Sequence, residues 1–389
     1  MLPAYVNKII DIFEQNAIEA YAVGGCVRDV LMNIPLGDID IAVGANTVDI
    51  KQMFDKVYST GEKYGTVTVI ADGAKAEVTM FRAEGNYTDH RHPSYVDAAD
   101  SIEQDLSRRD FTINAIAYNK RTGLIDPFGG QDDLKHKVIR TVGNPDTRFS
   151  EDYLRIMRAF RFASTLDFEI EPATQRAAVK VCTSLRNISR ERIYSELKKL
   201  LSGKRPSAIE PIIKHAGLEF LGLTYHSALA PLDRLPQTSS PGGRLAALCY
   251  LCAADVNFVC QQLKCENITK KTAAAVYSYI GKTFESEAQI KRALSQHGQS
   301  ILEDICAVNK VFIPSDNAES VLKGILTSGQ PYCLKMLAVN GDDIKDIATN
   351  PTTIGKCLSF LLKQVIENPT LNQRETLLNL AREFINDKL

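Results

Sequence analysis

The amino-acid sequence predicts an α+β fold, with an N-terminal head built on a mixed β-sheet with helices, followed by all-α neck, body and tail domains. Short runs rich in β-branched residues alternate with helical segments through roughly the first 125 residues. From about Glu151 onward, helical periodicity replaces this strand pattern. A chain of 389 residues also exceeds one ordinary hydrophobic core, so we expect several packed units.

The head draws its predicted strands from short segments in which β-branched and small apolar residues dominate. These segments are Tyr21–Val23, Ile39–Val43, Thr66–Ile70, Glu77–Phe81 and Ala115–Tyr118. Farther along, Gly and Pro interrupt the helical pattern at several points. We therefore expect a catalytic head over 1–136, a neck over 137–205, a body over 206–290 and a tail over 291–389.

Composition limits the partners and the compartment. The net charge of −1 gives no global attraction for nucleic acid, so any RNA must bind a local basic surface. The sequence has no apolar run long enough for a membrane span and no secretion signal at its start, so we expect no membrane partner. Nine irregularly spaced cysteines favour reduced thiols and a cytoplasmic location. Four of them, Cys249, Cys252, Cys260 and Cys265, lie in an apolar stretch that favours core packing over zinc binding.

Two glycines mark the first candidate site. Gly24 and Gly25 end a predicted strand and open a predicted helix, where bare backbone amides and the helix dipole can approach phosphate. Arg28 adds a positive charge one turn later. Taken alone, the two glycines could equally close a loop.

Two aspartates follow this turn. Asp38 and Asp40 are two residues apart in a predicted strand, so both carboxylates are expected on one face, as Mg²⁺ ligands. Glu77, at the start of another predicted strand, is a candidate third carboxylate. Metal ions bound in this way can stabilise both ends of an in-line displacement at phosphorus. The competing interpretation is that Asp38 and Asp40 are turn and edge-strand residues.

These motifs resemble those of a known family. Gly24–Asp29 together with Asp38–Asp40 is similar to the first motif of the class II tRNA nucleotidyltransferases. That family comprises the CCA-adding enzymes and their bacterial poly(A) polymerase relatives, within the polymerase-β-like superfamily. The next motifs of the family resemble, in order, Asp105–Ala115, Ile125–Leu134 and Ser150–Ala163. Weaker similarity to Bacillus-type CCA-adding enzymes continues to the end of the chain.

The second of these motifs contains adjacent guanidinium and carboxylate groups that suit phosphate and ribose hydroxyls. The resemblance implies this role for Arg109, Asp110 and Asn114. A surface ion-pair cluster is the alternative.

The last motif has an apolar stripe at helical spacing, with Asp152, Arg155 and Arg158 along a polar arc of the same predicted helix. The resemblance implies that Asp152 and Arg155 act as a protein template selecting CTP and ATP, and that Arg158 and Arg161 also contact the nucleotide. Taken alone, this segment would be a salt-bridged amphipathic helix.

Two further segments carry weaker signals. The polar stretch 84–96 resembles the flexible loop of family members that add the terminal A, and we expect its His90 and His92 to be solvated. After Ser189, a neck helix presents basic residues that are candidate tRNA backbone contacts, or else a solvated face. They are Arg190, Arg192, Lys198 and Lys199.

The resemblance implies a Mg²⁺-dependent CCA tRNA nucleotidyltransferase. Such an enzyme adds C, C and A to the tRNA 3′ acceptor end from CTP and ATP, without a nucleic-acid template, and releases pyrophosphate. An A-adding enzyme, a poly(A) polymerase and a catalytically silent RNA-binding protein are the alternatives. We expect a monomer or a homodimer.

Overall fold

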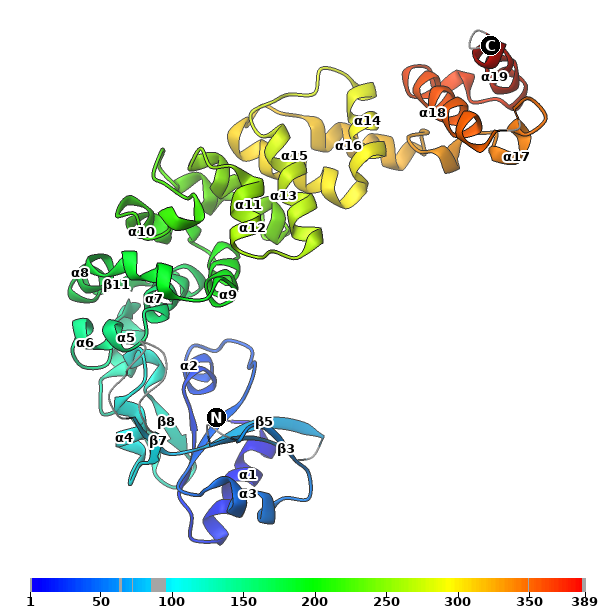
Figure 1. Ribbon diagram of the computed structural model, residues 1–389. Coiled ribbons are helices and arrows are strands. Elements are labelled where there is room, and N and C mark those ends of the chain that lie inside the picture. Colours follow the sequence, from blue (N-terminus) through cyan, green and yellow to red (C-terminus); the bar gives the residue numbers. More distant parts are fainter. Residues whose placement is uncertain (1, 63–64, 72, 85–95, 349, 387–389) are drawn as a thin grey trace. The chain divides into compact units, whose positions relative to one another are not determined.

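The computed structural model describes residues 2–62, 65–71, 73–84, 96–348 and 350–386. The chain forms two compact units, Met1–Tyr225 and His226–Leu389 (Figure 1). The predicted four-part division is finer than these two units and stays a prediction. Most of the predicted loop at 84–96, including His90 and His92, lies outside the described residues.

A seven-stranded mixed sheet forms the centre of the head, as predicted. Its strand order is β3-β4-β5-β2-β1-β8-β9, with β2 and β5 parallel and the other described neighbours antiparallel. The bounds are β1 (Ala20–Val23), β2 (Asp40–Val43), β3 (Val57–Gly61), β4 (Thr66–Ala71), β5 (Ala74–Met80), β8 (Ala117–Asn119) and β9 (Gly123–Ile125). All five predicted strands are present, and β3 and β9 are additional.

One hydrophobic cluster covers one face of the sheet, and a second, smaller cluster lies against the other face. Ile41 and Val43 of β2 and Val78 of β5 are fully buried, and they share a cluster with Val6 and Phe13 of α1 (Ala4–Gln15). Side chains next to them in the strands point to the opposite face, because side chains alternate along a strand. The pocket described below lies on that opposite face of β2 and β5.

Shorter elements complete the head. They are α2 (Gly25–Leu31), α3 (Thr47–Met53), β6 (Arg82–Glu84), β7 (Val96–Ala98), α4 (Ile102–Ser107) and α5 (Gly130–His136). The backbones of β6 and β7 pair in an antiparallel ribbon. Strand β6 directly follows β5 by way of Phe81, so its first residue, Arg82, lies at the rim of the pocket.

The rest of the first unit is largely helical. Its helices are α6 (Pro145–Glu151), α7 (Leu154–Leu166), α8 (Pro172–Lys180), α9 (Arg190–Leu201) and α10 (Glu210–Lys214). The prediction of helix alone after Glu151 is wrong at one place, because β11 (Glu169–Ile170) pairs in parallel with β10 (Val138–Ile139). Only two residues take part in each strand, too few to leave a strand pattern in the sequence.

The second unit is helical throughout its described residues. Its helices are α11 (Pro241–Leu251), α12 (Val256–Gln262), α13 (Asn267–Tyr279), α14 (Glu287–His297), α15 (Gln299–Phe312), α16 (Ala318–Ser328), α17 (Gly341–Ile344), α18 (Pro351–Glu367) and α19 (Arg374–Asn386). No single helix in the described chain has the length and hydropathy of a membrane span. Helices α11 and α12 together have the length and composition of a membrane span, but the chain bends by 120° between them.

Four cysteines of this unit are core residues, as predicted. Cys249, Cys252, Cys260 and Cys265 are each at most 4% exposed. Burial raises the pKa of the Cys252 thiol to about 12, so the neutral form that suits an apolar core is favoured.

Candidate active site

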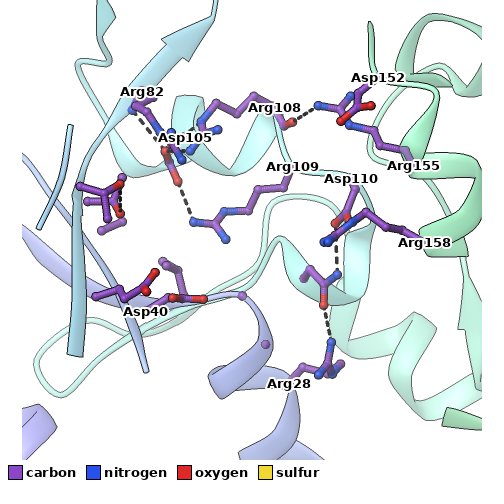
Figure 2. Close-up of a pocket in the computed structure, with 18 of the residues that line it drawn as sticks. Arg28, Asp40, Arg82, Asp105, Arg108, Arg109, Asp110, Asp152, Arg155 and Arg158 are labelled. Atoms are coloured by element: carbon purple, nitrogen blue, oxygen red, sulfur yellow. Dashed lines mark hydrogen bonds and ion pairs between the residues drawn. The ribbon is translucent and has the colours of Figure 1, made fainter. Parts of the chain in front are cut away.

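A pocket of about 560 Å³ opens in the first unit above β2 and β5. Figure 2 shows Asp40 on one side, Asp152, Arg155 and Arg158 on the other, and Arg109 between them. Eight arginines line the pocket: Arg28, Arg82, Arg108, Arg109, Arg155, Arg158, Arg161 and Arg192. Five carboxylates accompany them: Asp40, Glu77, Asp105, Asp110 and Asp152. This concentration of guanidinium groups suits a polyanionic ligand.

The glycine turn lies at the pocket floor, as predicted. Gly24 follows β1 with φ 73° and α2 begins at Gly25. A Cβ atom on Gly24 would lie 2.8 Å from Nη1 of Arg109, the far end of a flexible side chain, so the positive φ is the main reason that this position favours glycine. Arg28 donates from Nη1 to Oδ1 of Asn114 at 2.7 Å, which ties α2 to the segment that follows α4.

Asp40 and Glu77 face each other across the parallel pair of strands. They are register partners in β2 and β5, and both line the pocket. Burial raises the pKa of Asp40 to about 6; Arg109 opposes this shift, whereas the negative charges of Glu77 and Asp38 add to it. Glu77 lies in the middle of β5 and not at a strand start as predicted, because the strand extends back to Ala74.

Asp38 lies apart from this pair. Strand β2 begins at Asp40, so the prediction that both aspartates belong to one strand is wrong. The hydrogen bond from Glu77 N to Ile39 O, at 2.8 Å, is the last contact of the ladder before Asp38. The Asp38 side chain is 82% exposed and lies 3.6 Å from Nζ of Lys75.

The carboxylates offer the hard oxygen ligands that Mg²⁺ prefers. Within the described residues, however, no three His, Cys, Asp or Glu side chains are arranged to hold a metal ion. Asp40 and Glu77 bring two carboxylates together, and the raised pKa of Asp40 reflects first its burial and then the negative charges of Glu77 and Asp38, which Arg109 offsets only in part. The donor set therefore fits a cation, and the assignment of Asp38 and Asp40 as its ligands stays a prediction.

Two arginines of the second motif share one buried carboxylate. Asp105 of α4 is 1% exposed, with Oδ1 at 2.8 Å from Nη2 of Arg108 and Oδ2 at 3.0 Å from Nη2 of Arg109. Burial alone would raise the pKa of Asp105, but the charges of Arg109 and Arg108 outweigh it and lower the pKa. We did not assign Asp105 from the sequence, although its i, i+3 and i+4 spacing to the two arginines was a usable signal.

Asp110 connects the head to α7. Its Oδ2 lies 2.6 Å from Nη2 of Arg158, and its Oδ1 accepts from Nδ2 of Asn114 at 3.1 Å. Burial would raise the pKa of Asp110, but the Arg158 charge and these hydrogen bonds hold it at about 2. Asn114 in turn accepts from Arg28, so a continuous polar chain crosses the pocket (Figure 2).

Asp152 lies in a break between two helices, and Arg155 lies in the first turn of the second, α7. The sequence predicted one helix through both residues, but α6 ends at Glu151 and Asp152 has φ −144° and ψ 107°. Arg155 is 9% exposed, forms an ion pair with Glu151 and donates to Arg148 O at 3.0 Å. At the break itself, Leu154 N donates to Oδ1 of Asp152 at 2.9 Å, a local side-chain to backbone bond of the kind that competes with helix continuation.

Arg161 lies against an aromatic ring at the pocket edge. Its guanidinium is 3.7 Å from the centroid of Phe162, which also has Arg28 and Arg158 within 6 Å, at 5.2 and 5.6 Å. Glu196 of α9 forms an ion pair with Arg161 at 2.6 Å. The ring thus supports three cations at once.

The pocket therefore brings together all the predicted site residues except Asp38. Sequence analysis missed several lining residues: Thr66, Thr79, Arg82, Asp105 and Phe162. It considered Arg192 only as an RNA contact or a solvated residue. The helical pattern identified Phe162 as part of an element, and Arg82 lies just past the predicted strand Glu77–Phe81. Neither pattern gave a signal that these residues reach the pocket.

Two family models match the first unit. Residues 20–140 match the Poly A polymerase head domain, and residues 167–218 match the probable RNA and SrmB-binding site of polymerase A. The CCA-adding enzyme of Geobacillus stearothermophilus is 34% identical, with 94% of this chain and 93% of that protein covered. The CCA-adding enzyme of Ligilactobacillus salivarius is also 34% identical, over 100% of this chain and 99% of its own.

A solved structure is similar over the same extent. The Bacillus stearothermophilus CCA-adding enzyme in complex with CTP has a TM-score of 0.84 and 29% identity. The alignment covers 100% of this chain and 99% of that one.

Proposed function

Because this chain belongs to the family of CCA-adding enzymes and is a nucleotidyltransferase, we propose that it completes tRNA 3′ ends in a Mg²⁺-dependent reaction. It adds C, C and A in turn from CTP and ATP, with the protein itself in place of a nucleic-acid template. The observation that carries this proposal is that eight arginines line the same pocket as Asp40 and Glu77.

The reaction is a displacement at phosphorus. The 3′-hydroxyl oxygen of the tRNA attacks the α-phosphorus of the nucleotide and forms a new phosphodiester bond. The bond between the α-phosphorus and its bridging oxygen breaks, and pyrophosphate leaves with that electron pair. The hydroxyl proton passes to solvent or to a nearby base, and the chain is longer by one nucleotide. Catalysis of this kind depends mainly on positioning and charge neutralisation.

Arg108 and Arg109 are the residues best placed to bind the triphosphate. Both are fixed by Asp105, so little side-chain freedom is lost when a ligand binds. The amides at the glycine turn can approach the phosphates closely, because Gly24 has no side chain. Asp110 and Asn114 present an acceptor and a donor suited to ribose hydroxyls.

Asp152 and Arg155 would read the base. An acceptor beside a donor matches a base edge in which an amino group lies next to a ring nitrogen, and both cytosine and adenine have such an edge. Arg158 and Arg161 lie next to this pair on α7, and both are held by carboxylates. The protein can therefore recognise a base by hydrogen bonds alone.

We place the cation at Asp38 and Asp40, with Glu77 beside them. When bound, Mg²⁺ supplies charge stabilisation at the attacking oxygen and at the pyrophosphate. Asp40 and Glu77 are already adjacent, and their repulsion favours a positive charge between them. Asp38 is held only by an exposed ion pair with Lys75, and such pairs contribute no more than about 1 kcal/mol, so this contact is easily exchanged.

We also propose that the protein acts in the cytoplasm. All nine cysteines are free thiols, which suits a reducing compartment. The proposed oligomeric state, a monomer or a homodimer, can be measured by light scattering.

The function is tested by extension of tRNA transcripts that end before C74, at C74 or at C75. Each is incubated with CTP, ATP or both, in Mg²⁺ or in EDTA, and products are resolved to single nucleotides. We expect every transcript to be completed to CCA and then to stop, with no extension in EDTA. Addition of A to CC-ending transcripts alone would identify an A-adding enzyme, and long A tails a poly(A) polymerase. Binding of tRNA without extension would identify a silent RNA-binding protein.

A further inference from the structure

Arg192 reaches the nucleotide pocket from α9, outside the motifs that form the rest of the site. Its Nη2 donates to Oδ2 of Asp152 at 2.8 Å. Both side chains are well covered, with exposed fractions of 27% for Arg192 and 17% for Asp152. Arg192 is therefore neither a fully solvated residue nor placed on an open surface for RNA backbone contacts.

The position of Asp152 makes this contact important. Asp152 lies between α6 and α7 in an extended conformation, so helix geometry does not fix its side chain. Its Oδ1 accepts a hydrogen bond from Leu154 N at 2.9 Å. Arg192 holds the other oxygen. Together the two contacts set the plane of the carboxylate, while each oxygen keeps a further lone pair for a ligand.

Arg155 is held in a different way. Its described contacts come from α6 and from the end of α4, through Glu151, Arg148 O and Arg108 O. Asp152, by contrast, is bound directly to α9 through Arg192.

The orientation of Asp152 matters because of base chemistry. Cytosine and adenine each carry an exocyclic amino group, a donor, where uracil and guanine carry a carbonyl oxygen, an acceptor. A carboxylate accepts from the amino group and repels the carbonyl. A correctly aimed Asp152 would therefore admit CTP and ATP and reject UTP and GTP.

We propose that Arg192 is a positioning residue that aims the Asp152 carboxylate and thereby sets the discrimination between amino-bearing and carbonyl-bearing bases. This inference rests on the proposed function and adds a specificity determinant to it. Without Arg192, the Asp152 carboxylate can rotate about its side-chain bonds, and its repulsion of a base carbonyl weakens.

The test measures kcat/KM for CTP and for UTP on a tRNA transcript that ends before C74. Arg192→Gln removes the charge and Arg192→Lys keeps it. Arg186→Gln is the matched control, because Arg186 is an exposed arginine preceding α9 that does not line the pocket. We expect Arg192→Gln to lower the CTP-to-UTP ratio of kcat/KM about tenfold, the scale of one base-reading contact. Arg192→Lys restores part of the ratio, and Arg186→Gln leaves it unchanged.

A double-mutant cycle separates positioning from direct contact. If Arg192 acts through Asp152, then Asp152→Asn combined with Arg192→Gln discriminates no worse than Asp152→Asn alone. Multiplicative losses, or an unchanged ratio in Arg192→Gln, would overturn the inference. Thermal unfolding of each variant shows whether it is folded. Failure of the unsubstituted protein to add CCA would instead reject the proposed function.

Discussion

Asp40 and Asp110 line the same pocket, yet their pKa values are shifted in opposite directions. Asp110 lies 2.6 Å from Arg158 and accepts a hydrogen bond from Asn114, and its pKa is about 2. Asp40 is less completely buried but has Glu77 and Asp38 as neighbours, and its pKa is about 6. One side of the pocket contains its own counter-charges, whereas the other side lacks enough of them. The difference supports the proposed roles, in which the arginine side binds the nucleotide and the acidic side takes an external cation.

On the arginine side of the pocket, the arginines form ion pairs with carboxylates of the same chain. Four arginines from three different segments are each held by a carboxylate, in the pairs Arg109–Asp105, Arg158–Asp110, Arg161–Glu196 and Arg192–Asp152. A guanidinium has five N–H donors, so one ion pair leaves others free for a ligand. These pairs keep positive charges close together in the absence of nucleotide, and they reduce the ordering cost when it binds.

The largest expected effect is on the acidic side. Asp40→Asn should lower the rate of nucleotide addition by about a thousandfold or more, because loss of metal-linked charge stabilisation costs several kcal/mol. Single-turnover extension at saturating CTP and Mg²⁺ measures this. Glu77→Gln is the companion variant on the facing strand. A loss of less than tenfold in Asp40→Asn would show that the acidic side is not the reacting side.

Replacing Asp110 should act on stability. Asp110→Asn leaves the Arg158 charge without its partner, and we expect a loss of about 2 kcal/mol in the free energy of unfolding at pH 7. The folded-state pKa of Asp110 is lowered, so its contribution is present above the unfolded value of about 3.9 and is lost as the pH falls through about 2. Urea unfolding at pH 7 and at pH 3 measures this difference.

Asp40 supplies the contrast for the same experiment. Its folded-state pKa is raised, so the stability it contributes is present below about pH 4 and is lost as the pH rises through about 6. Without metal, Asp40→Asn should therefore be at least as stable as the unsubstituted protein at pH 7. If Asp40→Asn and Asp110→Asn destabilised the protein equally at pH 7, the contrast between the two sides would be wrong.

The smallest effect is expected at the pocket rim. Lys75→Gln removes the partner of Asp38 from an exposed pair, with side chains 73% and 82% exposed. Such pairs contribute less than about 1 kcal/mol, so we expect an unchanged unfolding midpoint and an addition rate within about threefold. A large rate loss would instead mean that Lys75 itself contacts the substrate. The rate is measured in the extension assay used for Asp40→Asn.

Local patterns were sufficient to predict the parts of the site formed by consecutive residues. The glycine turn before Arg28 and the strand beginning at Asp40 follow from turn chemistry and residue alternation. The break at Asp152 was not predicted, because the apolar stripe keeps its helical spacing on both sides of this residue and does not show a local interruption. Asp38 was assigned to the strand because a period of two cannot show where the ladder ends.

Sequence analysis also did not predict the contacts between segments that lie far apart in the chain. The anchoring of two arginines by Asp105 left a spacing signal in the sequence, but the approach of Arg192 to Asp152 joins residues from separate helices. Only folding brings α9 to the pocket. The motif segments thus identified most of the groups that line the pocket, and the tertiary structure identified the groups that hold them.

Because Gly24 has no side chain, Arg109 of the second motif can lie directly against the glycine turn of the first motif. The space that a methyl group would fill at position 24 is already taken by the guanidinium of Arg109. A side chain at position 24 would displace this end of Arg109, whose Nη2 pairs with Asp105, and Asp105 also holds Arg108. A single carbon added at the glycine turn would thus disturb the arginines that we propose to bind phosphate. It would impair nucleotide binding like a lost arginine, even though every charged side chain of the pocket was still present.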